Sequence, residues 1–307
     1  MSLLVIGSVA FDDIETPFGR AEKIVGGAGT YISWAASYFV QDISIISIVG
    51  EDFPESELEA LEQRGVDTSG IKVIEGGKSF FWAGRYHHNL NARDTLVTDL
   101  NVLADFDPVL TPAQKEMDFV MLGNLTPAIQ MSVIRQMARP PKVLALDTMN
   151  YWMDSAMTEL LKVLTHIDLL IINDEEARQL SGEYSLLKAS EIIREMGPKY
   201  LVIKKGEHGA LLFGEDQVFF APALPLNEVQ DPTGAGDTFA GGLMGYLASR
   251  NTIHFEALKQ AIICGSAMAS FCVEKFGTEA LRNLDMMALQ DRLDKFTQLV
   301  NFEAPVL

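Results

Sequence analysis

Runs rich in apolar residues alternate with helical stripes along most of the chain. The runs occupy residues 3–6, 43–49, 119–122, 143–146, 168–172 and 200–203. From residue 119 onward, each run is followed by a stretch with the 3.6-residue apolar period of a helix. Strands that alternate with helices in this way form βαβ units, whose sheets are mainly parallel. The pattern therefore predicts an α/β fold in which a mainly parallel central sheet carries helices on both faces.

Two parts of the chain interrupt this rhythm. Residues 79–86 and 95–103 have a β-type composition and flank a polar stretch, which predicts a hairpin rather than a βα crossover. A second antiparallel hairpin is predicted near one edge of the sheet, at residues 210–213 and 218–220. Helical patterns lie at 52–65, 235–249, 255–272 and 285–300. The sequence has no internal repeat or low-complexity segment, so residues 1–307 are interpreted as a single domain.

Composition and charge narrow the classes of function. The chain has 307 residues, 48% of them hydrophobic, and can bury a large core. No apolar run reaches the roughly 18–20 residues of a membrane span, and the formal charge of −18 argues against nucleic acid or an anionic membrane as a partner. Cys264 and Cys272 are eight positions apart on one predicted helix, which is about 12 Å at about 1.5 Å per residue, too far for a disulfide. We expect reduced cysteines and a cytoplasmic protein.

A glycine-rich stretch at residues 231–242, D-P-T-G-A-G-D-T-F-A-G-G, carries the clearest chemistry. Gly234 and Gly236 allow a close approach of the backbone to a ligand. A helical apolar stripe begins at Phe239, so the glycine turn lies at a helix N-terminus, where free N–H groups attract anions. Asp237 lies in the first turn of that helix. Such a carboxylate can be a simple partner of the helix dipole, or a base that deprotonates an alcohol attacking a phosphoryl group.

Polar residues mark the ends of several predicted strands, where α/β folds bind their ligands. They are Asp12, Asn124, Asp147 and Asn173. Asn173 and Glu176 also have the spacing of a capping box at the start of a helix. A second glycine-rich turn at residues 26–29 opens another predicted helix.

The 231–242 stretch resembles the C-terminal signature of the ribokinase-like (PfkB) family of carbohydrate and nucleoside kinases. The second glycine turn resembles the family's N-terminal G-G-x-x-x-N signature, and residues 7–12 resemble its G-S-x-x-x-D segment. The resemblance implies a ribokinase-like fold with a small β-lid, assigned to residues of about 11–24 and 71–103. It also implies an enzyme that uses ATP and Mg²⁺ to phosphorylate a hydroxymethyl group of a free sugar or a nucleoside.

The resemblance also implies residue roles. Asp237 would be the general base, and the N–H groups of Gly234, Ala235, Gly236 and Asp237 would stabilise the transferring phosphoryl group. The acceptor would contact Asp12, Gly26, Gly27, Tyr31, Asn124 and Asp147. The nucleotide side would comprise Asn173, Glu176, Lys204 and Gly206, with Glu176 acting on Mg²⁺ through water. Asp231, Thr233 and Gly277 resemble a monovalent cation site that would hold K⁺, and the family suggests a homodimer formed through the lid.

Three positions depart from the family pattern. Tyr31 and Ala28 stand where ribokinases have Asn and Lys, which weakens two polar contacts to a free sugar. Lys204 replaces a Thr on the nucleotide side. The alternative function is a non-catalytic sensor of a nucleotide or sugar, but the retained Asp237 and its glycine frame favour an enzyme. Arg85 and Arg93, on the predicted lid, are interpreted as solvated or paired rather than catalytic.

Aromatic residues on the lid bear on the acceptor. They are Phe80, Phe81, Trp82 and Tyr86. Because side chains alternate along a strand, either Phe81 or the other three would face the cleft. Aromatic side chains there suit stacking on a nucleobase, and they equally suit a lid–lid interface. The sequence favours a nucleoside over a free sugar as the acceptor.

Overall fold

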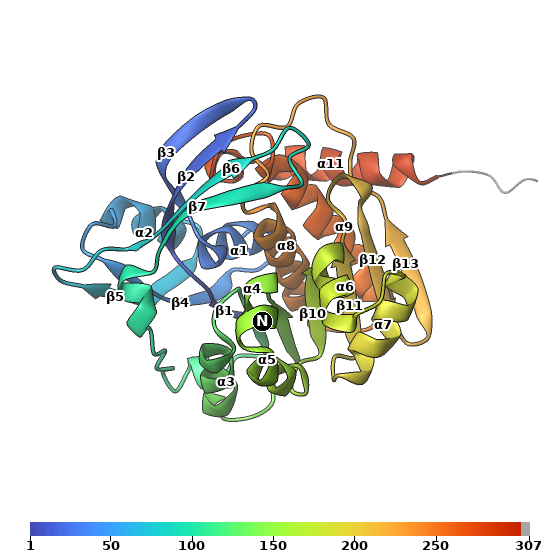
Figure 1. Cartoon of the computed structure of the whole chain (residues 1–307), viewed down its shortest axis with the longest axis horizontal. Helices are drawn as coiled ribbons and strands as arrows, with labels where there is room; N and C mark the ends of the chain where they lie inside the picture. The colour runs from blue at the N-terminus through green and yellow to red at the C-terminus, as the bar shows by residue number, and fades with distance from the viewer. Residues whose placement is uncertain (302–307) are drawn as a thin grey trace, which may run out of the picture.

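The computed structural model describes residues 1–301, in which the predicted α/β fold is confirmed (Figure 1). Over these residues a nine-stranded sheet has the order β13-β12-β11-β10-β9-β8-β1-β4-β5. The parallel strands are β1 (Ser2–Ile6), β4 (Asp42–Gly50), β5 (Val66–Ile74), β8 (Phe119–Leu122), β9 (Val143–Asp147), β10 (Leu169–Asn173) and β11 (Tyr200–Lys204). The predicted edge hairpin forms the antiparallel strands β12 (Ala210–Gly214) and β13 (Gln217–Ala221).

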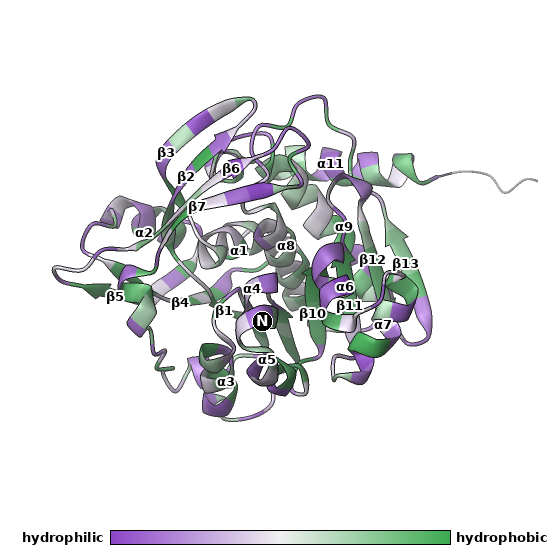
Figure 2. Cartoon of the chain, viewed as in Figure 1, coloured by the Kyte–Doolittle hydropathy of each residue, from purple (hydrophilic) through white to green (hydrophobic). Residues whose placement is uncertain are grey.

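Alternate residues of the central strands belong to two hydrophobic clusters, one on each face of the sheet. On β1, Leu3 and Val5 join one cluster, whereas Leu4 and Ile6 join the other. The first cluster includes residues of α1 (Ala28–Ala36), α2 (Glu55–Glu62), α8 (Ala235–Arg250), α9 (Phe255–Cys272), α10 (Glu279–Arg282) and α11 (Met286–Leu299). The second includes residues of α3 (Pro127–Gln136), α4 (Asn150–Ser155), α5 (Met157–Leu164), α6 (Asp174–Ser181) and α7 (Leu186–Glu195). The apolar central strands between the helices are visible in Figure 2.

A second sheet, here called the lid, is built from two separate parts of the chain. Within the described residues it has four strands in the order β3-β2-β6-β7, and in Figure 1 it lies above α1 and α8. Its strands are β2 (Ala10–Thr16), β3 (Gly19–Gly26), β6 (Phe80–Tyr86) and β7 (Arg93–Asp99). Strand β2 pairs antiparallel with β3 and parallel with β6, which joins the two parts.

The lid differs at its boundaries from the prediction of 71–103. Residues 71–74 belong to β5, which pairs in parallel with β4 at the edge of the large sheet. This edge strand mixes buried and exposed residues, and such a pattern is indistinguishable in sequence from that of a half-exposed lid strand. At the other end, Asn101–Asp105 form a 3₁₀ helix instead of continuing β7.

The helix predicted at 52–65 is also shorter in the structure. Helix α2 covers Glu55–Glu62, after Pro54. Asp52 is used differently, because its carboxylate accepts hydrogen bonds from the backbone N–H (2.8 Å) and hydroxyl (2.7 Å) of Ser79, at the entry to the lid. Within the described residues, no helix has the length and apolar character needed to cross a membrane.

Helix α8 is held in a fixed place because small residues let its neighbours approach closely. A Cβ atom on Gly241 would overlap the backbone of Ile32 in α1, and one on Gly242 would lie 3.1 Å from the backbone of α9 at Gly265. The helix is buried over most of its length between α1 and α9. Its N-terminus is thereby positioned beside the far end of β6, where Thr233 contacts Tyr86.

Candidate active site

The segment 231–237, here called the anion loop, leads into α8 through a left-handed residue. Gly234 has φ +73° and caps the helix, and the first helical hydrogen bond runs from Thr238 N–H to Gly234 O (2.8 Å). A Cβ atom on Gly234 would overlap the ring of Tyr31, so this position is limited to glycine by space as well as by φ. The first N–H groups of a helix lack intrahelical partners and attract anions. The loop therefore offers a site for a phosphate-sized anion.

Asp231 links the start of the anion loop to Gly277, which follows α9 in the chain. Its carboxylate is buried and accepts hydrogen bonds from the backbone N–H of Thr233 (2.8 Å) and of Gly277 (3.3 Å). Gly277 has φ +59°, which orients its N–H toward the carboxylate. The structure thus brings together the three residues predicted to hold a monovalent cation, and that role stays a prediction.

Asp237 lies in the first turn of α8, as predicted, and is half-buried. Burial and the negative charge of Asp147 raise its pKa to about 7, while Lys204 and Arg93 oppose the rise. A general base works best when its pKa lies near the operating pH. The carboxylate therefore has both the position and the proton affinity of a base at neutral pH.

Lys204, at the end of β11, places a positive charge against the anion loop. Its Nζ lies 3.4 Å from Oδ1 of Asp147, and a Cβ atom on Gly236 would be only 2.9 Å from that Nζ. Burial disfavours the charged ammonium, but Asp147, Glu176 and Asp237 together raise the pKa of Lys204 above its usual value. Lys204 therefore stays protonated at neutral pH. Asp147, predicted on the acceptor side, contacts Lys204 in the structure. Its acceptor role stays a prediction.

The capping box predicted at the start of α6 is present. Asn173 Oδ1 accepts from the N–H of Glu176 (2.8 Å), and Glu176 Oε2 accepts from the N–H of Asn173 (2.7 Å). Asn173 and Lys204 are register partners in β10 and β11, so this helix start lies next to the lysine. Burial and the charge of Asp147 raise the pKa of Glu176 to about 7. Glu176 therefore caps α6 and at the same time lies near the anion loop.

Asp12 lies on the other side of the anion loop, on β2. The side chain is 4% exposed, and a Cβ atom on Gly26 would overlap its carboxylate. Burial, followed by the charges of Asp231 and Asp237, raises the pKa of Asp12 to about 8. Its neighbour Asp13 instead accepts a hydrogen bond from Lys23 N–H (2.6 Å) within the lid hairpin. Asp12 is therefore the acid that faces the anion loop.

The other predicted acceptor residues have strong structural roles. Gly27 caps α1 with φ +93°. Tyr31 is 1% exposed, and within residues 1–301 its hydroxyl has no hydrogen-bond partner. Asn124 donates to Met149 Sδ (3.1 Å) and accepts from Trp152 Nε1 (2.8 Å), which ties it to α4. Their contacts with an acceptor stay predictions.

The lid contacts both sides of the site, which the sequence did not reveal. Thr233 donates to the hydroxyl of Tyr86 across 3.0 Å. At the tip of the lid, Asn91 Oδ1 would lie 2.8 Å from a Cβ atom on Gly206, the glycine predicted on the nucleotide side. In sequence, the only signal for these contacts is the alternation of side chains along β6.

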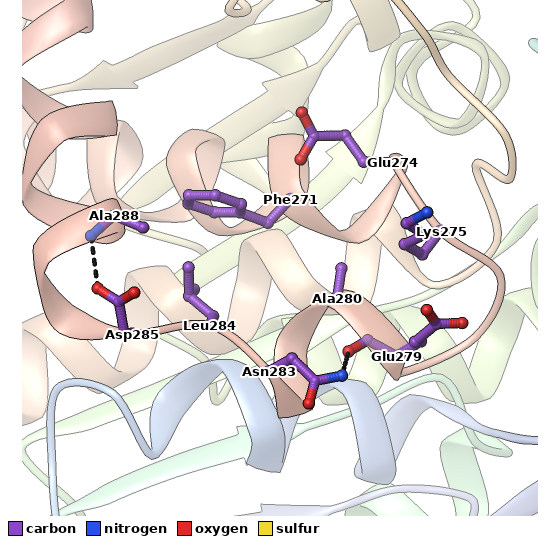
Figure 3. A pocket seen from close by; sticks show the side chains of 9 residues that line it. All are labelled: Phe271, Glu274, Lys275, Glu279, Ala280, Asn283, Leu284, Asp285 and Ala288. Atoms are coloured by element: carbon purple, nitrogen blue, oxygen red, sulfur yellow. Dashed lines mark hydrogen bonds between the residues drawn. The ribbon is translucent and has the colours of Figure 1, made fainter.

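One surface pocket lies outside this cluster, between α9, α10 and α11 (Figure 3). Two of its polar residues make local hydrogen bonds, from Ala288 N–H to Asp285 (2.8 Å) and from Asn283 to Glu279 O (2.9 Å). None of its lining residues belongs to the predicted site. Among the described residues, no group of three His, Cys, Asp or Glu side chains is arranged to hold a metal ion.

Comparisons with known proteins agree with this geometry. The chain is 27% identical to a cytidine kinase of Thermococcus kodakarensis, over 90% of this chain and 98% of that protein. It is 26% identical to a nucleoside kinase of Methanothermobacter thermautotrophicus, over 99% and 98% of the two chains. An Escherichia coli ribokinase II candidate, solved in complex with ATP and Mg²⁺, superposes with a TM-score of 0.77 at 19% identity, over 97% and 99% of the two chains. The model of the pfkB family carbohydrate kinases matches residues 2–284, and the chain belongs to that family.

Proposed function

We propose that the protein is an ATP-dependent nucleoside kinase that phosphorylates the hydroxymethyl group of a ribose. The observation that supports this most is the arrangement around the anion loop, with Asp237 at its centre, Asp12 toward the lid and Lys204 on the opposite side. Asp12 binds hydroxyls of the acceptor. Asp237 removes the proton of the attacking hydroxyl, the new O–P bond forms at the γ-phosphorus, and ADP leaves as the β–γ bond breaks.

The remaining groups stabilise the charge that moves during transfer. The N–H groups at the start of α8 and the ammonium of Lys204 face the oxygens of the transferring phosphoryl group. When bound with ATP, Mg²⁺ neutralises part of the triphosphate charge. Glu176 and Asn173 would bind its water shell, and their oxygens are the ligand type that Mg²⁺ prefers.

Three observations support a nucleoside over a free sugar. Trp82 of β6 is the register partner of Asp12 in β2, which puts an indole next to the acid that binds the sugar hydroxyls. Its ring extends over Gly84, where a side chain would overlap it. Ala28 and the buried Tyr31 stand in place of the Lys and Asn that ribokinases direct at a free sugar, and the two relatives named above are nucleoside kinases.

Acceptor class is tested by thermal melting with a panel of nucleosides and free sugars at matched millimolar concentration. A ligand at about 100 times its Kd adds about 2.7 kcal/mol to the free energy of unfolding, and each kcal/mol moves the midpoint of a large domain by about 2–4 °C. We expect a shift of several degrees with at least one of cytidine, adenosine, guanosine or inosine, and none with ribose or fructose. Trp82→Ala should weaken nucleoside binding by about 1–3 kcal/mol, while Tyr184→Ala, an aromatic exposed on the α6–α7 loop, should leave it unchanged. A shift with a sugar and none with a nucleoside contradicts the nucleoside proposal alone.

The rate should rise with pH through neutrality. Asp237 must be ionised to accept a proton, and its pKa is raised to about 7. Below that pH the base is protonated and transfer slows in proportion, so kcat/KM for the acceptor should climb tenfold per pH unit below about 7 and level off above it. A profile that is flat between pH 5.5 and 8.5 would show that another group is the base.

Three further properties are proposed: a K⁺ site, a homodimer and a cytoplasmic location. The cluster of Asp231, Thr233 and Gly277 supports a K⁺ site formed by backbone oxygens, which replacing K⁺ by Na⁺ in the assay tests. The exposed apolar side chains of Leu96 and Val97 on β7 support a homodimer through the lid, which Leu96→Asp should dissociate in sedimentation. Both cysteines are free thiols, which supports a cytoplasmic location.

A further inference from the structure

The anion loop is held at several points, but Gly234 has no side chain of its own with which to cap α8. Before it in the chain, the N–H of Thr233 donates to Asp231 (2.8 Å). After it, Gly236 lies against the ammonium of Lys204. The position of Gly234, between these two contacts, therefore depends on what packs against its backbone.

The ring of Tyr31 lies directly against Gly234. A Cβ atom on Gly234 would overlap three ring carbons of Tyr31, which are Cδ2, Cε2 and Cζ. Tyr31 belongs to α1, which packs beside α8 (Figure 1). Its side chain is buried, and within residues 1–301 its enclosed hydroxyl has no hydrogen-bond partner. A side chain enclosed in this way supports the neighbouring backbone and does not present its hydroxyl to a cleft.

The start of α1 also contacts the acceptor side of the site. Gly26 lies just before this helix, and a Cβ atom there would overlap the carboxylate of Asp12. Gly27 caps the helix, and its carbonyl oxygen accepts from the N–H of Tyr31 (3.2 Å). One helical turn therefore connects the backbone that touches Asp12 to the ring that touches Gly234.

We propose that Tyr31 is a positioning residue, whose ring sets the separation between Asp12 and the anion loop during phosphoryl transfer. The inference rests on the proposed kinase function. It gives Tyr31 a role that is exerted through Gly234, whereas the role predicted from sequence is a direct contact with the acceptor. The two roles differ in what they do to binding and to transfer.

The reaction explains why this separation matters. Transfer requires the attacking hydroxyl to lie about 3–3.5 Å from the phosphorus and in line with the bond that breaks. Asp12 holds the acceptor, and the N–H groups of the anion loop hold the phosphoryl group, so the contact between α1 and the loop sets this distance. Because protein interiors are as densely packed as organic crystals, a ring in contact with backbone resists displacement. Loss of the ring should therefore slow transfer more than it weakens the binding of either ligand.

The test compares variants of Tyr31 with Tyr200→Leu as the matched control. Tyr200 is also fully buried, and a Cβ atom on Gly214 would overlap its ring, just as one on Gly234 would overlap the ring of Tyr31. Tyr200 begins β11, at the opposite end of the strand from Lys204. Tyr200→Leu therefore removes the same kind of contact away from the site. Tyr31→Leu and Tyr200→Leu should both melt below wild type.

The kinetics should separate the variants. Tyr31→Leu should lower kcat by about 10–10²-fold, the cost of misplacing reacting groups by up to about 1 Å, while KM for the nucleoside stays within about twofold. Tyr31→Phe keeps the ring and loses only an unpartnered hydroxyl, so it should keep its kcat and melt at or above the wild-type temperature. Tyr200→Leu should keep its kcat at a temperature where it is folded. Tyr31→Met takes the place of Tyr31→Leu, with the same expectations, if the latter does not fold.

A second measurement does not depend on turnover. The nucleoside is the one among cytidine, adenosine, guanosine and inosine that gives the largest melting shift with wild type. Calorimetry with this nucleoside, ADP, Mg²⁺ and aluminium fluoride, a mimic of the transferring phosphoryl group, should show at least about tenfold weaker binding to Tyr31→Leu, because such a mimic loses what the transition state loses. The nucleoside alone should bind equally to Tyr31→Leu and wild type.

Three outcomes would overturn the proposal. An unchanged kcat in Tyr31→Leu would show that the ring does not position the loop. Weaker nucleoside binding to Tyr31→Phe and Tyr31→Leu, with kcat retained, would show that Tyr31 contacts the acceptor. A loss of kcat in Tyr200→Leu as large as that in Tyr31→Leu would show that lost stability alone lowers the rate. The kinase proposal fails separately, if wild type transfers phosphate to no sugar or nucleoside.

Discussion

Replacing Asp237 by Asn should lower kcat by about 10²–10⁴-fold while ATP binding and the fold are retained. The amide fills the same space at the start of α8 but cannot take the proton of the attacking hydroxyl. Folding should not suffer. The pKa of the carboxyl is raised in the folded protein to about 7 from its ordinary value of 3.8, so the stability it contributes is present at low pH and lost as the pH rises through 7. At pH 8 the Asn variant should therefore melt at or above the wild-type temperature.

Three measurements check these expectations. Steady-state kinetics with the identified acceptor gives kcat, calorimetry gives ATP binding, and thermal melting at pH 8 gives stability. The matched control is Glu256→Gln, because Glu256 is also an acid in the first turn of a helix, α9, where it pairs with Lys259 (3.0 Å). A carboxylate that serves only the helix dipole contributes little, and the control should keep its rate within about twofold. Equal rates for Asp237→Asn and wild type would show that Asp237 is only a partner of the helix dipole and not the general base.

The parts of the site that could be predicted from sequence are those encoded locally. The anion loop and the start of α8 follow from adjacent glycines and an apolar stripe, and the capping box follows from two residues three apart. Each of these features needs only a few neighbouring residues to form. The order of strands and helices was likewise predictable, because buried strands and amphipathic helices differ in period.

Contacts between distant parts of the chain could not be predicted. Asp147 and Lys204 are 57 residues apart, and Tyr86 and Thr233 are 147 apart, so no local pattern links them. The predicted boundary of the lid differs from the structure for a related reason, because β5 becomes an edge strand of the large sheet only by pairing with β4. Tyr31 shows the same limit. Its position in a family signature suggests an acceptor contact, which stays a prediction, but no local pattern reveals that its ring lies against Gly234.

Lys204→Met should cost both activity and stability, by different mechanisms. The ammonium lies against Gly236 of the anion loop, so its loss removes a donor to the phosphoryl oxygens, and we expect kcat/KM for ATP to fall about 10²–10³-fold. The same change leaves Asp147 buried without its partner, and breaking a buried pair from one side typically costs about 3–5 kcal/mol. Burial already raises the pKa of Asp147, with Lys204 opposing. Without Lys204 the carboxyl should stay protonated to higher pH, so the stability deficit should be small at pH 5 and grow toward pH 8.

The double variant Lys204→Met with Asp147→Leu separates the two losses. Replacing both partners by apolar groups removes the buried charge, and such replacements are often neutral or stabilising. We therefore expect the double variant to regain most of the lost melting temperature at pH 8, while its kcat/KM for ATP stays as low as that of Lys204→Met. Lys199→Met is the matched control, because Lys199 precedes the other end of β11 and is exposed near Glu215 (3.9 Å). If the double variant recovers activity along with stability, Lys204 serves only to neutralise Asp147, and the phosphoryl group is stabilised by the N–H groups of α8 without it.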